Sequence, residues 1–279
     1  MAEHDGGGSA DVIRLEREGP VARLTIDRPA QRNALTWAAM AQLRRRLAEV
    51  KAEAGIRVVV LTGAGDRAFC SGADLGTMAD GSSSTADLHD ARGELARLFR
   101  DLWELGKPVI ARVRGHALAG GFGLACACDL VIAAEDAIFG CPEIDVGLWP
   151  HMITVPLTRS MPPKRALELM MTGRRVDAAE AERIGFVQRV VPVDELDAAV
   201  ASLTATLAAK PPGAMRLGRD AFYATWDLAA EDALRLLHPM LTVAASTDEA
   251  TEGIAAFRDK RPPSWRAGLP PAHDGSASD

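Results

Sequence analysis

The sequence predicts an α/β core followed by a mainly helical C-terminal region. Segments typical of strands and of helices alternate as far as Pro150, and the pattern beyond it is helical for most of the remaining length. The chain has 279 residues, 48% of them hydrophobic and 25% charged, which is an ordinary globular composition. A chain of this length can bury roughly 75% of the surface that its unfolded form exposes, enough for one large core.

The N-terminal half begins with two alternating runs around Gly19 and Pro20, which are typical of a β-hairpin over 12–29. A periodic segment then predicts a helix over 36–54, with Thr36 as its N-cap. Further strands and helices are predicted in turn: a strand over 56–65, a helix over 87–105, a strand over 108–115, a helix from Gly120 and a strand over 129–136.

The C-terminal half contains one predicted strand, over 186–192. Its predicted helices span 163–171, 177–184, 194–209, 213–226, 231–245 and 248–258. A single core does not cover all their apolar faces, so we expect part of this region to pack on another subunit. The chain therefore divides into a core over 11–205 and a helical oligomerisation region over 206–267. Tails rich in Gly, Pro and Ser, over 1–10 and 268–279, are expected to be disordered.

Composition argues against several classes of function. A net charge of −6 and a pI near 5.6 disfavour nucleic acid or an anionic membrane as the partner. No apolar run approaches the ~18 residues of a membrane span. The histidines lack metal-ligand spacing, so no metal is expected, and neither a full dinucleotide-binding motif nor GxSxG is present. The cysteines lie in apolar or glycine-rich contexts, which predicts packed, reduced thiols and a cytoplasmic protein.

Two segments combine small residues with the end of a strand or the start of a helix. They read AFCSGADL over 68–75 and HALAGGFGL over 116–124. Small residues let the backbone approach a ligand, and the first N–H groups of a helix have no intrahelical partner. Such groups can stabilise a developing negative charge, as in an oxyanion hole. The same residues fit a second explanation equally, in which the glycines only allow close packing of helix and sheet.

Five motifs follow one another in an order known from one family. They are RPAQRNAL, AFCSGADL, GHALAGGFGLACACDLVIAAEDAIFGCPEIDVGL, MTGRRVDAAEAERIGFVQRVVP and EGIAAFRDKRPPSW. In these motifs the chain resembles the enoyl-CoA hydratase/isomerase (crotonase) superfamily over nearly its whole length. The resemblance implies an α/β fold: a crotonase-like spiral of ββα units with a C-terminal helical trimerisation region. It also implies a homotrimer or a dimer of trimers.

The resemblance further implies an acyl-CoA substrate, no separate cofactor, and particular site residues. The backbone N–H groups of Ala73 and Gly120 would hold the thioester oxygen as it becomes an enolate, and Glu143 would act as acid and base. Hydratases of this family use two glutamates around a water, and Gly123 stands at the position of the other one. The addition of water requires two carboxylates, whereas a 1,3-proton shift requires one base. Gly123 therefore favours isomerase chemistry, or else leaves room for a bulky acyl group.

Two candidate acid–base residues have alternative interpretations. Glu143 could cap or ion-pair at a surface turn, but its apolar neighbours Phe139, Ile144 and Val146 predict a buried carboxyl with a raised pKa. His151 stands where one branch of the family has an acid. It is expected either to take part in catalysis or to line the pocket.

Binding CoA calls for cationic side chains even on an acidic protein. The resemblance implies contacts with CoA for Arg28, Arg32 and Ala34 near the N-terminus, and for Phe257 and Lys260 near the C-terminus. For the three cationic residues, a solvated surface position is the alternative.

Enoyl-CoA isomerisation is therefore the first hypothesis for the function of this chain. Hydration of trans-2-enoyl-CoA is the second, since it uses the same oxyanion hole and the same glutamate. A non-catalytic acyl-CoA-binding protein is the third, and it predicts tight binding without turnover of any enoyl-CoA.

Overall fold

The computed structural model describes residues 11–74 and 84–268, and their strands form two sheets. The larger sheet has six strands in the order β1-β2-β3-β5-β7-β10, and the smaller has four in the order β4-β6-β8-β9. The strands are β1 (Ile13–Glu18), β2 (Val21–Ile26), β3 (Val58–Gly63), β4 (Ala68–Cys70), β5 (Val109–Val113), β6 (His116–Leu118), β7 (Leu130–Ala134), β8 (Ile138–Gly140), β9 (Arg175–Asp177) and β10 (Arg189–Val191).

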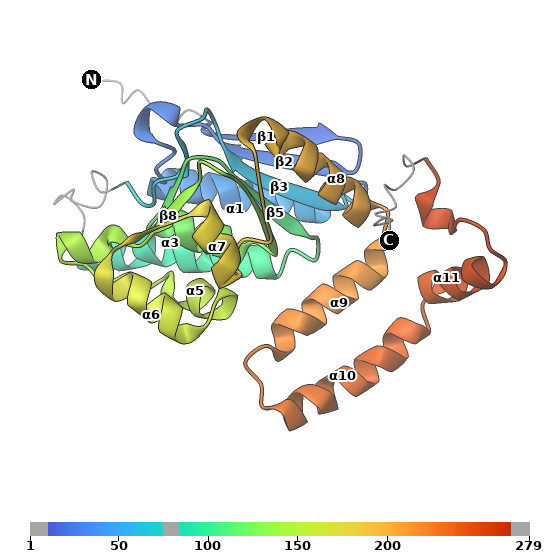
Figure 1. Cartoon of the computed structure of the whole chain (residues 1–279). Helices are drawn as coiled ribbons and strands as arrows, with labels where there is room; N and C mark the ends of the chain where they lie inside the picture. The colour runs from blue at the N-terminus through green and yellow to red at the C-terminus, as the bar shows by residue number, and fades with distance from the viewer. Residues whose placement is uncertain (1–10, 75–83, 269–279) are drawn as a thin grey trace, which may run out of the picture.

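Helices surround the two sheets (Figure 1). The α-helices are α1 (Trp37–Ala52), α3 (Thr85–Trp103), α4 (Gly120–Ala127), α5 (Thr154–Ser160), α6 (Pro163–Thr172), α7 (Ala178–Ile184), α8 (Leu196–Ala208), α9 (Pro212–Thr225), α10 (Ala230–Ala245) and α11 (Asp248–Arg258). Short 3₁₀ helices are η1 (Pro29–Gln31), η2 (Pro142–Val146), η3 (Val193–Glu195) and η4 (Ser264–Arg266).

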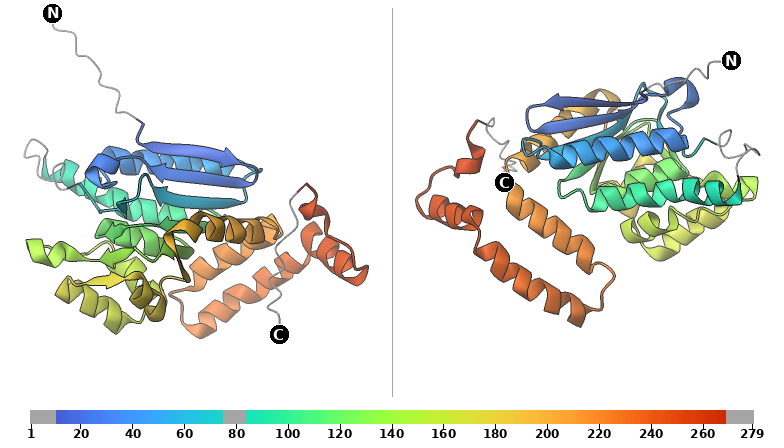
Figure 2. Two further views of the ribbon diagram at one scale, coloured as in Figure 1. Left: turned by 45° about the horizontal axis from the view of Figure 1, so that its top comes forward. Right: turned by 180° about the vertical axis from the view of Figure 1, so that it is seen from behind.

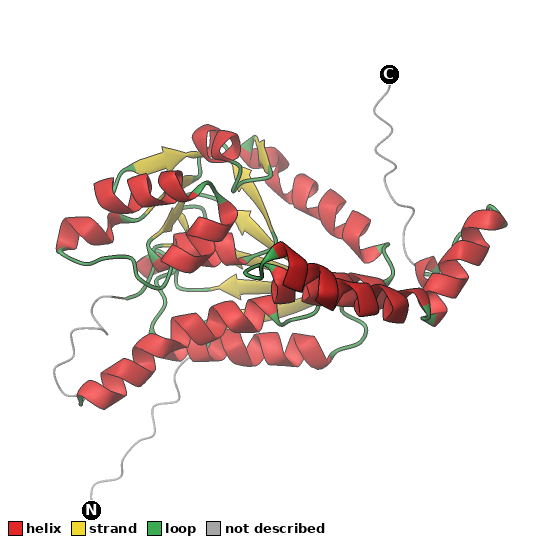
Figure 3. Cartoon of the chain, turned by 90° about the horizontal axis from the view of Figure 1, so that it is seen from below, coloured by secondary structure: helices red, strands yellow, loops and turns green. Residues whose placement is uncertain are grey.

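The six-stranded sheet is covered on both faces. Its first two strands form the antiparallel hairpin, and the strands from β2 to β10 are parallel. Successive residues of β3 belong to different cores: Val59 and Leu61 pack toward α1 and α3, whereas Val58 and Val60 pack toward α8. This alternation is what a strand buried between two layers of helices requires. Figures 2 and 3 show α1 and α3 lying side by side, with the strands between helical layers.

The helices α9, α10 and α11 form an arm that projects from the core (Figures 1 and 2). We call these helices the C-terminal arm. Several of its large apolar side chains are mostly exposed: Leu234, Leu241, Val243, Ile254 and Phe257. Uncovered apolar surface of this extent is typical of an interface between subunits, so the predicted oligomerisation of this region remains a prediction with a structural basis.

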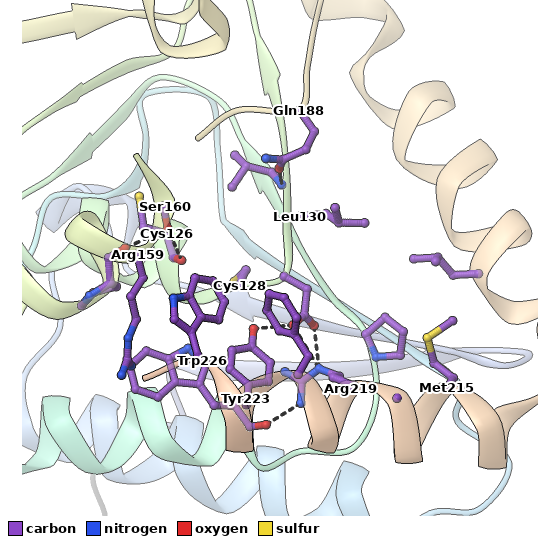
Figure 4. Close-up of a pocket in the computed structure, with 18 of the residues that line it drawn as sticks. Cys126, Cys128, Leu130, Arg159, Ser160, Gln188, Met215, Arg219, Tyr223 and Trp226 are labelled. Atoms are coloured by element: carbon purple, nitrogen blue, oxygen red, sulfur yellow. Dashed lines mark hydrogen bonds and ion pairs between the residues drawn. The ribbon is translucent and has the colours of Figure 1, made fainter. Parts of the chain in front are cut away.

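A buried ion pair fixes the base of the arm on the core (Figure 4). Nε of Arg219, in α9, donates to both carboxylate oxygens of Asp129 at 3.0 and 2.9 Å. The Tyr223 hydroxyl donates to the same carboxylate at 2.6 Å. The remaining guanidinium nitrogens of Arg219 donate to the carbonyls of Leu102 and Trp103 at the end of α3. The arm therefore depends on one nearly inaccessible arginine with four acceptor contacts.

The longer predicted elements are confirmed. Thr36 caps α1 by accepting the Ala39 N–H at 3.1 Å, and all four cysteines are buried. Helix α3 begins earlier than predicted because Ser84 and Asp87 form a capping box. The strands β6, β8 and β9 and helix α5 were not predicted, since three to seven residues carry too little periodicity.

Only some of the predicted boundaries between the regions of the chain can be compared with the structure. Helix α8 packs on the sheet up to Ala208, and the arm begins at Pro212, close to the predicted border at 206. The tail over 1–10 and nearly all of the tail over 268–279 lie outside the described residues. None of the described helices combines the length and apolarity needed to span a bilayer.

Replacing Arg219 by Met should lower the free energy of unfolding by about 3–5 kcal/mol, because it leaves the Asp129 carboxylate buried without its main partner. Urea denaturation at a fixed protein concentration measures this loss. The double variant R219M/D129N should recover part of it, since the unpaired charge is then gone.

The matched control is Arg235→Met, which removes an arginine paired with Glu231 on the exposed face of α10. Its effect should stay within about 0.5 kcal/mol, as for other exposed ion pairs. Equal losses in R219M and R235M would contradict the anchoring role of Arg219.

Candidate active site

The end of β4 and the start of α4 touch each other through glycine residues. Gly72 has φ +98°, and a Cβ there would lie 2.7 Å from Cβ of Ala119 and 3.1 Å from the Gly120 nitrogen. A Cβ at Gly121 would lie 2.1 Å from the Cys70 carbonyl oxygen. The distances of 2.7 and 2.1 Å are shorter than real Cβ contacts, so only glycine allows this approach. Close packing and free amide groups are therefore joint consequences of the same glycines, not alternatives.

The turn over 71–74 leaves one of its four amide groups without an acceptor among the described residues, and that amide belongs to Ala73. The other three are paired: Ser71 N–H with Arg32 O (3.1 Å), Gly72 N–H with Cys70 Sγ (3.4 Å) and Asp74 N–H with Leu35 O (2.9 Å). Backbone N–H groups that are buried are rarely without a partner in proteins, and Ala73 is half-buried. A ligand oxygen would supply the missing acceptor.

The amide of Gly120 lies beside that of Ala73. Gly120 is the first residue of α4, so its N–H has no intrahelical acceptor. Ala119, just before it, has φ +51° and ψ −127°, a conformation that L-residues rarely adopt. A Cβ at Gly120 would lie 3.6 Å from the Ala73 nitrogen, which makes the two amide groups neighbours. The predicted pair of donors is thus brought together, with the positive end of a helix dipole behind one of them.

Glu143 lies in η2, the 3₁₀ helix that follows β8. The carbonyl of Gly140, three residues earlier, accepts the Ala119 N–H at 2.8 Å, which ties β8 to the residue preceding the helix. Oε2 of Glu143 is buried and has no hydrogen-bond partner in the described part of the chain. Burial raises the pKa of this carboxyl to about 7. The structure therefore holds an acid that can gain and lose a proton near neutral pH.

The predicted burial is confirmed for Oε2 of Glu143, although the residue as a whole is half-buried. The reason given for this burial is partly wrong. Phe139 is fully buried, whereas Ile144 and Val146 are exposed. The segment is a 3₁₀ helix and not an extended strand. The exposed side chains of Ile144 and Val146 therefore do not account for the burial of Glu143 Oε2.

Gly123 does not open a space for substrate. A Cβ there would lie 2.2 Å from Cγ2 of Ile153 and 3.2 Å from Cζ of Phe99. Ile153 is 2% exposed and belongs to the main core. The expectation that Gly123 accommodates a bulky acyl group is therefore wrong, because an isoleucine from the start of α5 already fills that volume. No local pattern pairs these two residues, so sequence reasoning missed Ile153.

His151 lies on the exposed turn before α5. Its backbone N–H donates to the Trp149 carbonyl at 2.8 Å, and its side chain forms no hydrogen bond or ion pair with the described residues. The structure thus gives His151 no partner that would orient it as an acid or base, and its participation in catalysis stays a prediction.

The two arginines expected to bind CoA face different surroundings. The guanidinium of Arg28 donates to the Ala34 carbonyl and, at 3.2 Å, to the Asp74 carboxylate. These contacts hold the guanidinium against the protein, and the predicted contact of Arg28 with CoA stays a prediction. Arg32 is exposed and forms no ion pair among the described residues, so it is free to meet a phosphate. Ala34 is buried at 9% exposure between these segments.

Phe257 and Lys260 lie far from the other predicted CoA contacts within one chain. Phe257 is 87% exposed at the end of α11, and α11 packs on α9 and α10, away from β8 (Figures 1 and 2). One protomer does not bring these two residues together with Arg32 and Ala34.

Comparison with known proteins agrees with this geometry. The sequence pattern of the enoyl-CoA hydratase/isomerase family matches residues 16–268. A protein of Mycobacterium bovis named "Probable enoyl-CoA hydratase" is 36% identical over 259 residues, covering 91% of this chain and 98% of the relative. Carnitinyl-CoA dehydratase of Proteus mirabilis is 34% identical over 259 residues, with coverage of 91% and 98%.

Solved structures give the same assignment for the fold. The crystal structure of an enoyl-CoA hydratase from Mycobacterium smegmatis superimposes with a TM-score of 0.87 at 32% identity, covering 91% of this chain and 99% of that one. The predicted crotonase fold is thereby confirmed. In sequence and in structure, the chain belongs to the enoyl-CoA hydratase/isomerase family and is an enzyme of that family.

Proposed function

We propose that this enzyme shifts the double bond of an enoyl-CoA thioester by moving a proton through Glu143. The observation that carries the proposal is a single buried carboxyl with an unpaired oxygen, together with Ile153 filling the volume beside Gly123. A second carboxylate at position 123 has no room. A proton shift needs one group that is first base and then acid, and a pKa of about 7 suits both roles.

In the proposed reaction the Glu143 carboxylate removes a proton from C2 of a 3-enoyl thioester. The electron pair of the broken C–H bond moves toward the carbonyl, and the negative charge develops on the thioester oxygen. The amides of Ala73 and Gly120 donate to that oxygen, which lowers the barrier without any reorganisation. Glu143 then returns the proton to C4, and the double bond lies between C2 and C3. No separate cofactor or metal is called for.

Hydration of 2-enoyl-CoA is the second candidate, and the names of the relatives favour it. Those proteins are named enoyl-CoA hydratase and carnitinyl-CoA dehydratase, so water addition and removal occur in the same family. In this chain a residue at a position other than 123 would have to orient the water, because Gly123 has no side chain. A non-catalytic acyl-CoA binder is the remaining alternative.

The proposal includes a homotrimer or a dimer of trimers in the cytoplasm. The exposed apolar face of the C-terminal arm supports association, and so does the position of Phe257 and Lys260. Because these two residues lie far from Arg32 within one chain, we propose that they meet the CoA bound by a neighbouring protomer. The thioester end and the phosphate end of one acyl-CoA molecule would then be held by different subunits.

Glu143→Gln should lower kcat for 3-enoyl-CoA isomerisation by about 10²–10⁴-fold, because it removes the proton carrier. Wild-type kcat/KM should rise with pH through about 7 and then level, since the free enzyme must hold the carboxylate as base. Isomerisation and crotonyl-CoA hydration are measured side by side across pH.

The control is Asp145→Asn, which removes an exposed carboxylate on the same 3₁₀ helix and should leave both rates unchanged. Hydration faster than isomerisation in the wild type would contradict the preference for a proton shift. Tight binding of enoyl-CoA with neither reaction would instead favour the non-catalytic binder.

Glu143 should also make stability depend on pH. Its folded-state pKa is raised above the unfolded value of 4.5, so its contribution is fully present below pH 4.5 and is lost as pH rises through about 7. Between pH 5 and pH 8 the wild type should lose on the order of 2 kcal/mol from this group, and E143Q should not. Thermal unfolding at both values tests this. If Tm differs between wild type and E143Q by the same amount at pH 5 and at pH 8, folding does not desolvate the carboxyl.

Gly123→Ala should lower the free energy of unfolding by about 1–3 kcal/mol, because its Cβ collides with Ile153. The pair G123A/I153A should be more stable than the sum of the two single losses predicts, since each change makes room for the other. Chemical denaturation of the four proteins gives the coupling. Strict additivity would show that the two side chains do not compete for one volume.

A further inference from the structure

The outer face of the four-stranded sheet carries His116 and Arg175. The register pairs His116 of β6 with Ile138 of β8, and Gly140 of β8 with Arg175 of β9. The residues of the row between these two pairs are fully buried: Ala117, Phe139 and Val176. Because successive residues of a strand point to opposite faces of a sheet, His116 and Arg175 share the face that is turned away from the core.

Arginines reach this part of the sheet from three different segments. Arg67 precedes β4, and its carbonyl accepts the His116 N–H at 3.1 Å. Arg32 belongs to the loop beside β4, and its carbonyl accepts the Ser71 N–H at 3.1 Å. Cγ of Arg175 would lie 3.4 Å from a Cβ at Gly140, so this side chain lies against β8, the strand next to β6.

The guanidinium groups of these three arginines are exposed, and none forms a hydrogen bond or an ion pair with the described residues. Arg174, the sequence neighbour of Arg175, is different, because it pairs with both Glu168 and Glu180. The acid on the same face of the sheet, Asp177, is the N-cap of α7 and accepts the Glu180 N–H at 2.7 Å. The three positive charges are therefore not neutralised by the protein that surrounds them.

The side chain of His116 reports that the three charges converge. Burial lowers the pKa of His116. The positive charges of Arg175, Arg32 and Arg67 lower it further, and the charge of Asp136 acts in the opposite direction. Nδ1 of His116 is buried and has no hydrogen-bond partner in the described part of the chain. The centre of the cluster is thus a neutral ring at neutral pH, which adds no charge of its own.

We propose that Arg32, Arg67 and Arg175 form a binding site for a phosphate group on the outer face of the four-stranded sheet. A phosphate offers several acceptor oxygens, and its contacts with guanidinium groups are among the strongest hydrogen bonds in proteins. Three like charges close together repel one another, and a bound anion removes that repulsion. The net charge of the whole chain is −6, so this cluster differs in sign from the rest of the molecule.

The phosphate site and the oxyanion hole lie at opposite ends of the same strands. Ala73 and Gly120 follow β4 and β6, whereas Arg67 precedes β4 and His116 begins β6. A strand of three residues is about 10 Å long, so the site suits a phosphate held at a distance from the thioester. CoA carries such groups, and a free phosphate is the other source. The assignment to CoA rests on the proposed function, whereas the binding of phosphate itself does not.

The experiment compares wild type, R67Q, R175Q and R67Q/R175Q on two substrates: a 3-enoyl-CoA and the same acyl group on N-acetylcysteamine, which lacks the phosphates. Each single change should raise KM for the CoA thioester about 3- to 10-fold, and the double change about 10- to 100-fold, because charged contacts with phosphate are lost. The value of kcat should not change, since the thioester end is untouched. KM for the N-acetylcysteamine thioester should stay constant in all four proteins.

Binding of inorganic phosphate is measured separately by calorimetry, with sodium chloride at the same ionic strength as the reference. Kd for phosphate should rise about 10-fold or more in R67Q/R175Q. The matched control is Arg45→Gln, which removes an exposed arginine of α1 that has no ion pair with the described residues. It should change neither Kd for phosphate nor KM for the CoA thioester.

The two measurements together identify the ligand. A rise in KM for the CoA thioester alone assigns the site to the phosphates of CoA, and weaker binding of phosphate with an unchanged KM assigns it to free phosphate. The proposal is overturned if R67Q/R175Q matches wild type in both measurements, if its KM rises equally on both thioesters, or if R45Q has the same effect. A wild type that converts neither thioester contradicts the proposed function, and the phosphate titration then still decides whether the site exists.

Discussion

The contact between the end of β4 and the start of α4 is the constraint on which the site depends. Gly72 and Gly121 allow main-chain atoms of the two segments to approach within distances that any Cβ would prevent. Because of this contact, two amide groups from distant parts of the sequence become neighbours, and one of them is the first N–H of a helix. The sheets and core helices hold the two segments in place, and the polar groups left unpaired at their junction are available to a ligand.

Glu143 is a second polar group that is left unpaired in the structure, at a cost in stability. An ordinary surface glutamate is ionised at neutral pH and does not lower the free energy of unfolding. Glu143 loses hydration on folding, and its Oε2 gains no hydrogen-bond partner among the described residues. The fold tolerates the cost because large apolar clusters stabilise both faces of the main sheet. The consequence is a carboxyl whose two protonation states are close in free energy at neutral pH, which is the property that a group ferrying a proton needs.

The sequence contains the information for local features but not for pairs of distant residues. The hairpin at Gly19, the capped start of α1 and the glycine segments are coded by a few adjacent residues, and prediction succeeded there. The family resemblance located Ala73, Gly120 and Glu143. It could not show that Ile153 fills the volume beside Gly123, since packing between α4 and α5 leaves no periodic signal. It also gave no indication that Arg28 contacts Asp74.

Arg28 and Arg32 show why residue type alone cannot assign a role in binding CoA. Both stand in one motif on an acidic chain, and both carry a charge that suits a phosphate. The backbone reverses at Arg32 and Asn33, so Arg28 turns inward to Asp74 whereas Arg32 remains in solvent. A left-handed pair of residues thus separates a cation that the protein itself engages from one that is exposed to solvent. Conformation, rather than charge, decides which of the two arginines has partners within the protein.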